Sequence, residues 1–211
     1  MPTRSSLAYR ASFRYHVQML IAMGYQRLGE RALRDMDEPS ITGKLVCAMR
    51  DAMAADDAPR WVAKYSLRDD PPVDVPGKHG RDRPRVDIEV ERVQRGPRPC
   101  YHWEAKRLRD RSSMGAYLGR EGLGCYLRAA YARWSEEAGM LGYVEVDDEA
   151  AWAARFDQRL QEDPKRFCVL KNGAWTHARV VPQLEHSYRT EHSRGRGRRS
   201  ITVYHVLLRF C

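Results

Sequence analysis

Residues 85 to 108, RVDIEVERVQRGPRPCYHWEAKRL, are the stretch of this sequence that decides the fold. Apolar and polar side chains alternate in two runs, at about residues 85–93 and 100–108, and a turn rich in glycine and proline separates the runs. A period of two is typical of β-strands that bury one face, and a short loop commonly joins neighbouring antiparallel strands. The stretch therefore predicts an antiparallel β-hairpin.

Acidic side chains are expected on one face of this hairpin. On the first strand, Asp87 should point away from the apolar face formed by Val86, Ile88 and Val90. On the second strand, Glu104 is the acid that an adjacent strand could bring close to Asp87. Hard carboxylate oxygens suit Mg²⁺ or Mn²⁺, and one or two carboxylates with water and phosphate are a common set of Mg²⁺ ligands. The hairpin therefore predicts a divalent-cation site.

Lys106 follows Glu104 by two residues, so the two side chains should share a face. A lysine there could orient or deprotonate a metal-bound water, or offset charge in a phosphodiester transition state. The triplet Glu104-Ala105-Lys106 alone is weak evidence for a catalytic site, because Asp163-Pro164-Lys165 repeats its pattern at a predicted helix end. Lysine is nevertheless the rarer choice in a chain with 31 arginines and 6 lysines, and only lysine readily changes its protonation state. An exposed hairpin with alternating charge is the alternative.

The hairpin resembles the core of the PD-(D/E)XK nuclease superfamily, in which an acid on one strand precedes a Glu/Asp-x-Lys on the next. By position, Asp87 matches the first acid, Glu104 the second and Lys106 the lysine. The family often adds a glutamate from a preceding helix, for which Glu38 is the candidate and Glu30 the alternative. The resemblance implies an α/β class with a restriction-endonuclease-like α/β/α sandwich, a central mixed sheet and a β-rich C-terminal extension.

The resemblance also implies an activity and a setting. It implies a Mg²⁺-dependent endonuclease, with Mn²⁺ as a possible substitute, that hydrolyses phosphodiester bonds in DNA. Asp87, Glu104 and the carbonyl of Ala105 would bind the metal, while Lys106 and Glu38 would complete the catalytic group. A role in phage defence or restriction, partner proteins of a defence system, and a homodimer for double-strand cleavage follow from the family alone.

The remaining pattern predicts a single domain over residues 1–211. It divides into an N-terminal helix (1–37), a catalytic core (38–146) and a C-terminal helix with a β-rich extension and an arginine-rich loop (147–211). Apolar spacing and turn residues predict the other elements. We expect helices at about 12–36, 39–53, 112–138 and 147–161, and further strands at about 61–67, 140–146, 166–170, 175–181 and 200–210.

Two sets of polar residues outside the hairpin are candidates for substrate contact. Four residues on the predicted 112–138 helix recur at helical spacing and could face the site or the DNA, or could form an ordinary solvated face: Tyr117, Arg120, Glu121 and Arg128. Five arginines separated by glycines could form a flexible phosphate-binding arm, or a loop that binds nothing: Arg189, Arg194, Arg196, Arg198 and Arg199.

Composition limits the classes of function. The formal net charge of +9, from 37 basic and 28 acidic residues, favours polyanionic partners. No apolar run of 18 residues and no secretory signal are present, and the five scattered cysteines form no C-x-x-C pair, which together predict a cytoplasmic protein without a membrane partner. Two rival functions are a catalytically inactive nuclease-fold module that binds nucleic acid, and a basic assembly subunit that binds RNA or protein.

Overall fold

All strands of the computed structural model join one mixed sheet. The structure describes residues 4–29, 33, 35–171, 173–195 and 197–210, and every structural statement below concerns these residues. Across the seven-stranded sheet the order of the strands is β1 (Tyr65–Asp69), β2 (Ile88–Arg92), β3 (Cys100–Leu108), β4 (Glu137–Val144), β7 (Ile201–Arg209), β6 (Ser187–His192) and β5 (Thr176–His177).

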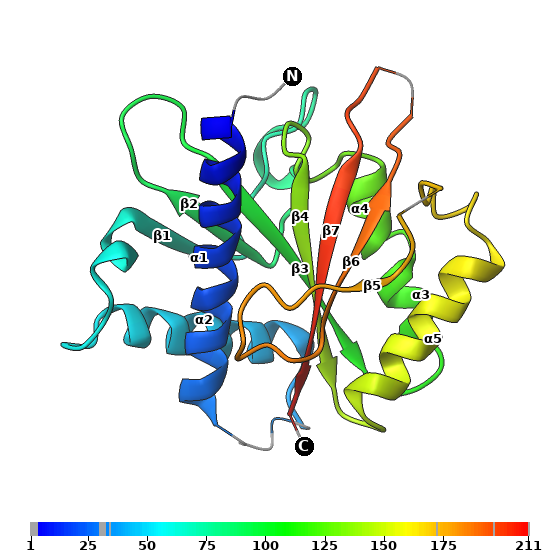
Figure 1. The fold of residues 1–211 in the computed structure, drawn as a ribbon, viewed down its shortest axis with the longest axis horizontal. Helices are drawn as coiled ribbons and strands as arrows, with labels where there is room; N and C mark the ends of the chain where they lie inside the picture. Colours follow the sequence, from blue (N-terminus) through cyan, green and yellow to red (C-terminus); the bar gives the residue numbers. More distant parts are fainter. Residues whose placement is uncertain (1–3, 30–32, 34, 172, 196, 211) are drawn as a thin grey trace.

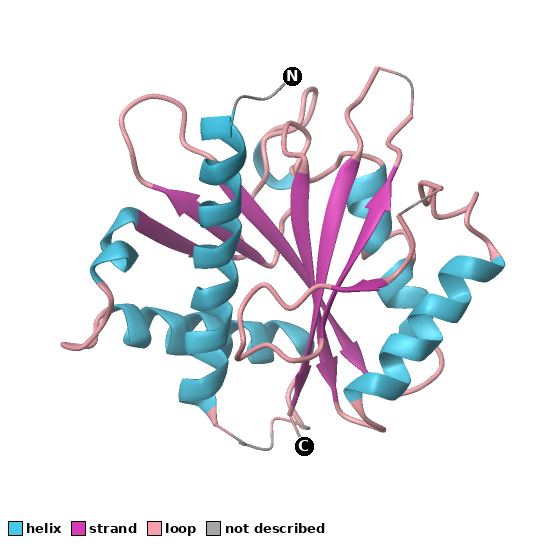
Figure 2. Ribbon diagram, in the orientation of Figure 1, coloured by secondary structure: helices cyan, strands magenta, loops and turns pink. Residues whose placement is uncertain are grey.

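The centre of the sheet is parallel and its two sides are antiparallel. β3, β4 and β7 run in the same direction, whereas β1–β2–β3 and β7–β6–β5 pair antiparallel. The strands fan out across the middle of the molecule in Figure 2. Parallel neighbours need a long crossover, and helices supply it between β3 and β4 and between β4 and β7.

Helices cover both faces of the sheet (Figure 1). α1 (Arg4–Leu28) and α2 (Glu38–Met53) pack on one face, and α3 (Ser113–Leu118), α4 (Leu123–Leu127) and α5 (Glu149–Glu162) pack on the other. Two short 3₁₀ helices complete the described elements: η1 (Arg60–Lys64), whose Val62 joins the core beneath α1 and α2, and η2 (Gly80–Asp82). This architecture confirms the predicted α/β class and the mixed sheet between helices.

β3 is an interior strand of the sheet, and both of its faces are covered. Trp103 and Ala105 point into the core shared with α1 and α2, and Leu108 points into the core shared with α3 to α5. The Trp103 ring lies against Gly139 of β4 so closely that a Cβ there would come within 2.1 Å of it. Gly139 therefore allows the bulkiest side chain of β3 to pack against the neighbouring strand.

The predicted hairpin is confirmed, and β3 has the bounds expected for the second strand. One detail of the first strand is wrong. Ile88 and Val90 join the core beneath α1 and α2, but Val86 joins the opposite core. Regular strand geometry begins only at Ile88, so the alternation does not extend back to Val86.

The predicted helix over 112–138 is wrong. Two short helices, α3 and α4, replace it, and turns follow to the start of β4. Glycines make the break possible, because a Cβ at Gly119 would lie 2.0 Å from the Gly115 oxygen and one at Gly122 would lie 2.1 Å from the Tyr117 oxygen. Such contacts exclude any larger residue from the turn.

The C-terminal part is not an extension beside the core. β7 pairs with β4 inside the sheet, so residues after 146 complete the same layer. Residues 166–170 contribute only an isolated bridge between Val169 and His192, and β5 is limited to Thr176–His177. Within the predicted arginine-rich loop lies a strand that the pattern did not indicate, β6.

β6 escaped prediction because its inward-facing residues are polar. His192 Nδ1 donates to the Phe167 oxygen (2.8 Å), so its Nε2 must accept from the Thr190 hydroxyl (2.6 Å). Thr190 Oγ1 then accepts from His205 Nε2 (2.8 Å), and His205 Nδ1 accepts from the Tyr117 hydroxyl (3.1 Å). All four side chains are fully buried, and each of the hydrogen-bonding atoms named here has a partner.

This buried hydrogen-bond network should make the protein less stable in acid. Burial lowers the pKa of His192 to about 4 and lowers that of His205. Between pH 6.5 and 4 the unfolded chain binds protons that the folded protein does not, so the free energy of unfolding decreases as the pH falls. Relative to His192→Gln, the wild type should lose about 2 kcal/mol between pH 7 and 5 in urea unfolding. His177→Gln, at an exposed position, is the control and should not change the pH dependence; an identical pH profile for His192→Gln and wild type would contradict the prediction.

None of the described helices combines the length and the apolar composition needed to cross a lipid bilayer.

Candidate functional site

The candidate site is built on the β2–β3 hairpin. The register pairs Ile88 with Trp103, which places Asp87, one residue before β2, opposite Glu104. Asp87 Oδ2 accepts a hydrogen bond from the Ala105 backbone nitrogen at 2.6 Å. This bond fixes the Asp87 side chain across the strand pair, so both acids lie at the same point of the sheet.

Lys106 gathers the other candidate residues around its ammonium group. Its Nζ donates to Glu38 Oε1 at 2.9 Å, to Glu104 Oε1 at 2.9 Å and to the Ala105 oxygen at 2.7 Å. A lysine ammonium has three protons, and these three acceptors use all of them. The four predicted catalytic residues therefore meet in one place, although Glu38 and Lys106 are 68 positions apart in the sequence.

The start of α2 places Glu38 at the hairpin. Asp37 caps the helix by accepting from the Ser40 nitrogen at 3.0 Å, and Pro39 suits the first turn. Glu38 is the first residue of α2, where the helix dipole favours a negative charge. Its second carboxylate oxygen accepts from the Arg107 nitrogen at 2.9 Å, so Glu38 bridges the Lys106 side chain and the β3 backbone.

Burial shifts the protonation of both hairpin acids. Burial raises the pKa of Glu104 to about 8, and the nearby Asp87 charge adds to this increase. Burial also raises the pKa of Asp87 to about 6, against the lowering effect of the Lys106 charge. For Lys106 burial opposes the charged form, but the carboxylates of Glu104 and Asp87 outweigh it and raise the pKa above its usual value. The site therefore holds a stable ammonium beside acids that carry an unfavourable negative charge.

One carboxylate oxygen of the site lacks a partner. Glu104 Oε2 is buried, and no hydrogen bond reaches it within the described part of the chain. A buried carboxylate oxygen without a donor is costly, and a divalent cation would relieve this cost. The carboxylates of Glu38, Asp87 and Glu104 do not all lie within 4.8 Å of one another among the residues described. The three carboxylates therefore do not form a ready-made three-ligand group in the described part of the chain.

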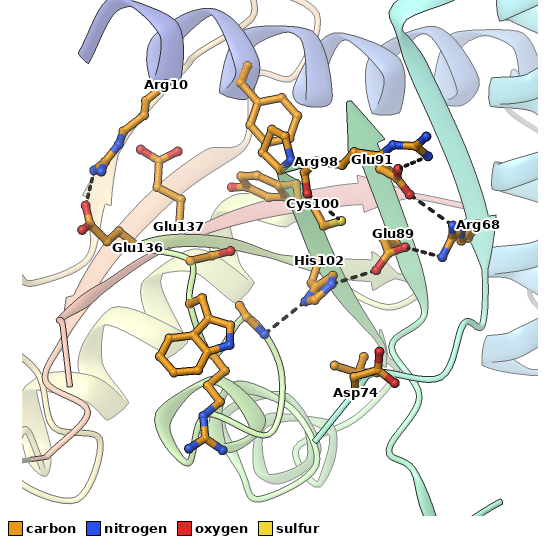
Figure 3. Close-up of a pocket in the computed structure, with 18 of the residues that line it drawn as sticks. Arg10, Arg68, Asp74, Glu89, Glu91, Arg98, Cys100, His102, Glu136 and Glu137 are labelled. Atoms are coloured by element: carbon orange, nitrogen blue, oxygen red, sulfur yellow. Dashed lines mark hydrogen bonds and ion pairs between the residues drawn. The ribbon is translucent and has the colours of Figure 1, made fainter. Parts of the chain in front are cut away.

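A second polar row, not predicted as a site, lies two residues further along the same strands (Figure 3). Glu89 pairs with His102 in the register. The His102 Nδ1 atom accepts from the Ala132 nitrogen at 3.1 Å, so its Nε2 carries the proton and donates to Glu89 Oε2 at 3.0 Å. This hydrogen bond is the main reason that the pKa of Glu89 is lowered. The sequence signal was the same alternation that marked Asp87 and Glu104.

The outer end of this row combines two acids with a cysteine. Glu89, Glu91 and Cys100 offer ligand atoms within 4.8 Å of one another, so the group could hold a metal ion. Arg68 already forms ion pairs with both glutamates, at 3.3 and 3.1 Å, and Arg98 forms another with Glu91 at 2.9 Å. Burial raises the pKa of the Cys100 thiol to about 12, which keeps it protonated and a poor ligand. The ion pairs therefore account for this cluster without a cation.

The predicted supporting stripe does not exist as one helical face. Tyr117 lies in α3, is fully buried and bonds to His205, so it does not face the site or a substrate. Arg120 and Glu121 are exposed in the turn between α3 and α4. Arg128 follows α4 and donates to the Arg120 oxygen at 2.7 Å.

The predicted arginine arm is partly a structural element. Arg194 is buried and donates to the oxygens of Ala132 and Ser135, at 2.9 and 2.8 Å, which overturns its assignment to a flexible arm. Arg198 and Arg199 are exposed, and Arg198 donates to the Arg128 oxygen at 3.0 Å. Two predicted residues, Arg196 and the alternative acid Glu30, lie outside the described residues. Arg189 lies on β6 in a weak ion pair with Glu191 at 3.9 Å.

Comparisons of the chain with protein-family models, with curated proteins and with solved structures found no match.

Proposed function

We propose that this protein is a metal-dependent endonuclease with the restriction-endonuclease-like fold of the PD-(D/E)XK superfamily. The observation that supports it most is the position of the Lys106 ammonium between Glu38, Glu104 and the Ala105 oxygen. Asp87 completes the group through its bond to the Ala105 nitrogen. These residues come from a helix terminus and two strands, and chance charge alternation on a hairpin does not account for the contribution of α2.

The proposed cation ligands are Asp87, Glu104 and the carbonyl oxygen of Ala105. These are hard oxygen donors, which suit Mg²⁺ and also Mn²⁺, and the partnerless Glu104 Oε2 supports the fit. When bound, the cation would stabilise negative charge on the phosphate and lower the pKa of a water molecule. Because Lys106 contacts two of the same ligands, the ammonium and the cation would share them.

Lys106 is proposed to keep its proton. The surrounding carboxylates outweigh burial and raise its pKa, so a role as a general base at neutral pH is disfavoured. A charged Nζ would instead offset negative charge on the phosphate. Glu38 would act as a positioning residue, since it bonds to both Lys106 Nζ and the Arg107 nitrogen.

The substrate is proposed to be DNA, because the charge supports a polyanionic substrate and the family resemblance supports DNA. The net charge of +9 favours a polyanion, and exposed arginines, among them Arg120, Arg198 and Arg199, could contact phosphates. Double-strand cleavage by one such site would require two protomers, which supports a homodimer as part of the proposal. A cytoplasmic defence role with partner proteins remains part of the same proposal and depends on the family resemblance.

A substrate panel tests the proposal. Purified protein would be incubated with supercoiled, linear and single-stranded DNA, and with RNA, in Mg²⁺, Mn²⁺ or EDTA. We expect cleavage of at least one substrate in Mg²⁺ or Mn²⁺ and none in EDTA. Binding that EDTA does not change, without cleavage in either metal, would instead favour the inactive binding module.

A further inference from the structure

Trp134 is displayed to solvent by the loop between α4 and β4. Its side chain is 87% exposed, whereas Trp103 and Trp152 are buried in the two cores. The guanidinium of Arg133 lies over the indole, 5.3 Å from the ring centroid. Exposed tryptophan is uncommon, and among the described residues Arg133 alone stacks on this indole, which leaves a face free for a ligand.

The loop that carries Trp134 is held in place by buried groups. Ala129 and Ala132 have φ angles of 55° and 47°, in the left-handed region that alanine rarely adopts. The Ala132 nitrogen donates to His102 at 3.1 Å, and Arg194 donates to the Ala132 and Ser135 oxygens. An unusual backbone fixed from two sides indicates that the display of Trp134 is built into the fold.

A hollow of about 650 Å³ opens beside this loop (Figure 3). Trp134 and Arg133 line it, and Phe13 and Tyr9 of α1 contribute further aromatic side chains to its lining. This volume lies within the range of small-ligand sites and suits a nucleotide. His102 also lines the hollow and lies two residues from Glu104 along the same face of β3.

The acids of the hollow are already neutralised by arginine. Glu89 and Glu91 pair with Arg68, and Glu136 pairs with both Arg10 and Arg199. Paired carboxylates repel a phosphate less than free ones do. The hollow therefore combines aromatic surface with a nearly balanced charge, which suits a base better than it suits a phosphate group.

Exposed arginines outside the hollow provide the complementary charge. The Arg198 side chain donates to the Arg128 oxygen at 3.0 Å, and the Arg128 side chain donates to the Arg120 oxygen at 2.7 Å. The three arginines therefore lie close together. All three residues are exposed, and Arg128 and Arg198 adjoin the loop that carries Trp134. Aromatic platforms beside basic surface are the common means by which proteins bind single strands. A protein partner would be expected to need a larger apolar patch than one tryptophan offers.

We propose that Trp134 stacks on an unpaired base and that the hollow beside it receives this nucleotide. The inference deepens the proposed nuclease function and rests on it in one respect, because it names the substrate as nucleic acid with unpaired nucleotides. Fully paired duplex has no free base to offer to the indole, so it would bind through phosphate contacts alone.

Binding measured without cleavage tests the inference. Labelled single-stranded DNA and RNA oligonucleotides and a blunt duplex of the same sequence would be titrated in EDTA with the wild type, Trp134→Ala, Trp134→Phe and Tyr15→Ala. Tyr15 is a matched control, because it is an exposed aromatic residue outside the hollow. Trp134→Ala should weaken single-strand binding about tenfold or more, and Trp134→Phe should restore most of it. Tyr15→Ala, and duplex binding by every variant, should match the wild type.

The outcomes separate this inference from the nuclease proposal. Wild-type single-strand affinity in Trp134→Ala, an equal loss for single strand and duplex, or no binding of the wild type to any single-stranded oligonucleotide would overturn the inference. Metal-dependent cleavage together with unchanged binding by Trp134→Ala would overturn it and leave the nuclease proposal intact. Single-strand binding that depends on Trp134, without cleavage in any metal, would support the inference and refute the nuclease proposal.

Discussion

Glu104→Gln and Asp87→Asn are each expected to lower metal-dependent cleavage by more than about 100-fold. Each substitution replaces a charged ligand oxygen by an amide while nearly preserving the shape of the side chain. Glu104 is 5% exposed and Asp87 bonds to the Ala105 nitrogen, so both oxygens have fixed positions that a neutral amide cannot replace electrostatically. Initial rates in Mg²⁺ on the substrate identified by the panel give the measurement.

Asp163→Asn is the matched control for these substitutions. Asp163-Pro164-Lys165 repeats the acid-x-lysine triplet, but Asp163 ends α5 and accepts from the Arg166 nitrogen at 3.1 Å. The Asp163→Asn substitution should therefore leave the cleavage rate unchanged. Equal rates for Glu104→Gln and the wild type, or an equal loss in Asp163→Asn, would contradict the assignment.

Mg²⁺ is expected to raise the melting temperature of the wild type by about 5 to 10 °C at 100 times its dissociation constant. The metal-free site carries a buried oxygen without a donor, Glu104 Oε2, and burial raises the pKa of Glu104 to about 8. A cation that binds only the folded protein removes this cost, and the gain at that concentration is about 2.7 kcal/mol. Thermal unfolding followed by circular dichroism, with Mg²⁺ or EDTA, measures the shift.

The pH dependence of this shift has a definite sign. A carboxyl group whose pKa is raised in the folded protein stabilises it in acid, and this stabilisation is lost as the pH rises from about 4.5 toward 8. The metal-free protein should therefore lose stability over this range through Glu104, while the Mg²⁺ shift should grow as fewer protons compete for the ligands. Glu104→Gln should lack most of the shift at every pH, and a shift that survives this substitution would place the cation elsewhere.

The hairpin could be predicted because its signals are local. The alternation of apolar and polar residues predicted the two strands. The two-residue period placed Glu104 and Lys106 on one face, where Lys106 Nζ donates to Glu104 Oε1 at 2.9 Å. The contact of Lys106 with Glu38 is long-range, and the family resemblance, not any local pattern, selected Glu38 in advance. The α/β class followed from the order of helices and strands.

The incorrect secondary-structure predictions share a physical cause. In these segments polar or small residues occupy the buried or closely packed positions. β6 buries Thr190 and His192 in place of apolar side chains, so it carries no hydrophobic alternation. The predicted helix after the hairpin is broken where backbone atoms approach Gly119 and Gly122 too closely for a side chain. Such contacts depend on segments distant in the sequence or on tight turns, and residue patterns do not reveal them.

Arg194 shows the same limit for charged residues. A run of arginines and glycines resembles a solvated arm, but Arg194 is buried and satisfies two carbonyl oxygens of the loop that carries Trp134. Arginine can fill this role because its planar guanidinium offers several donors in fixed directions. The composition of the segment therefore indicated charge correctly but not the position of each residue.

Single-turnover cleavage by Lys106→Met tests the central claim most directly, because this lysine contacts Glu38, Glu104 and the Ala105 oxygen at once. The substitution removes the ammonium group, while a side chain of similar length remains. With Mg²⁺, we predict a cleavage rate about 100- to 10,000-fold below that of the wild type, with the Mg²⁺-dependent rise in melting temperature retained. Cleavage by Lys106→Met at the wild-type rate, or wild-type cleavage that persists in EDTA, would contradict the account.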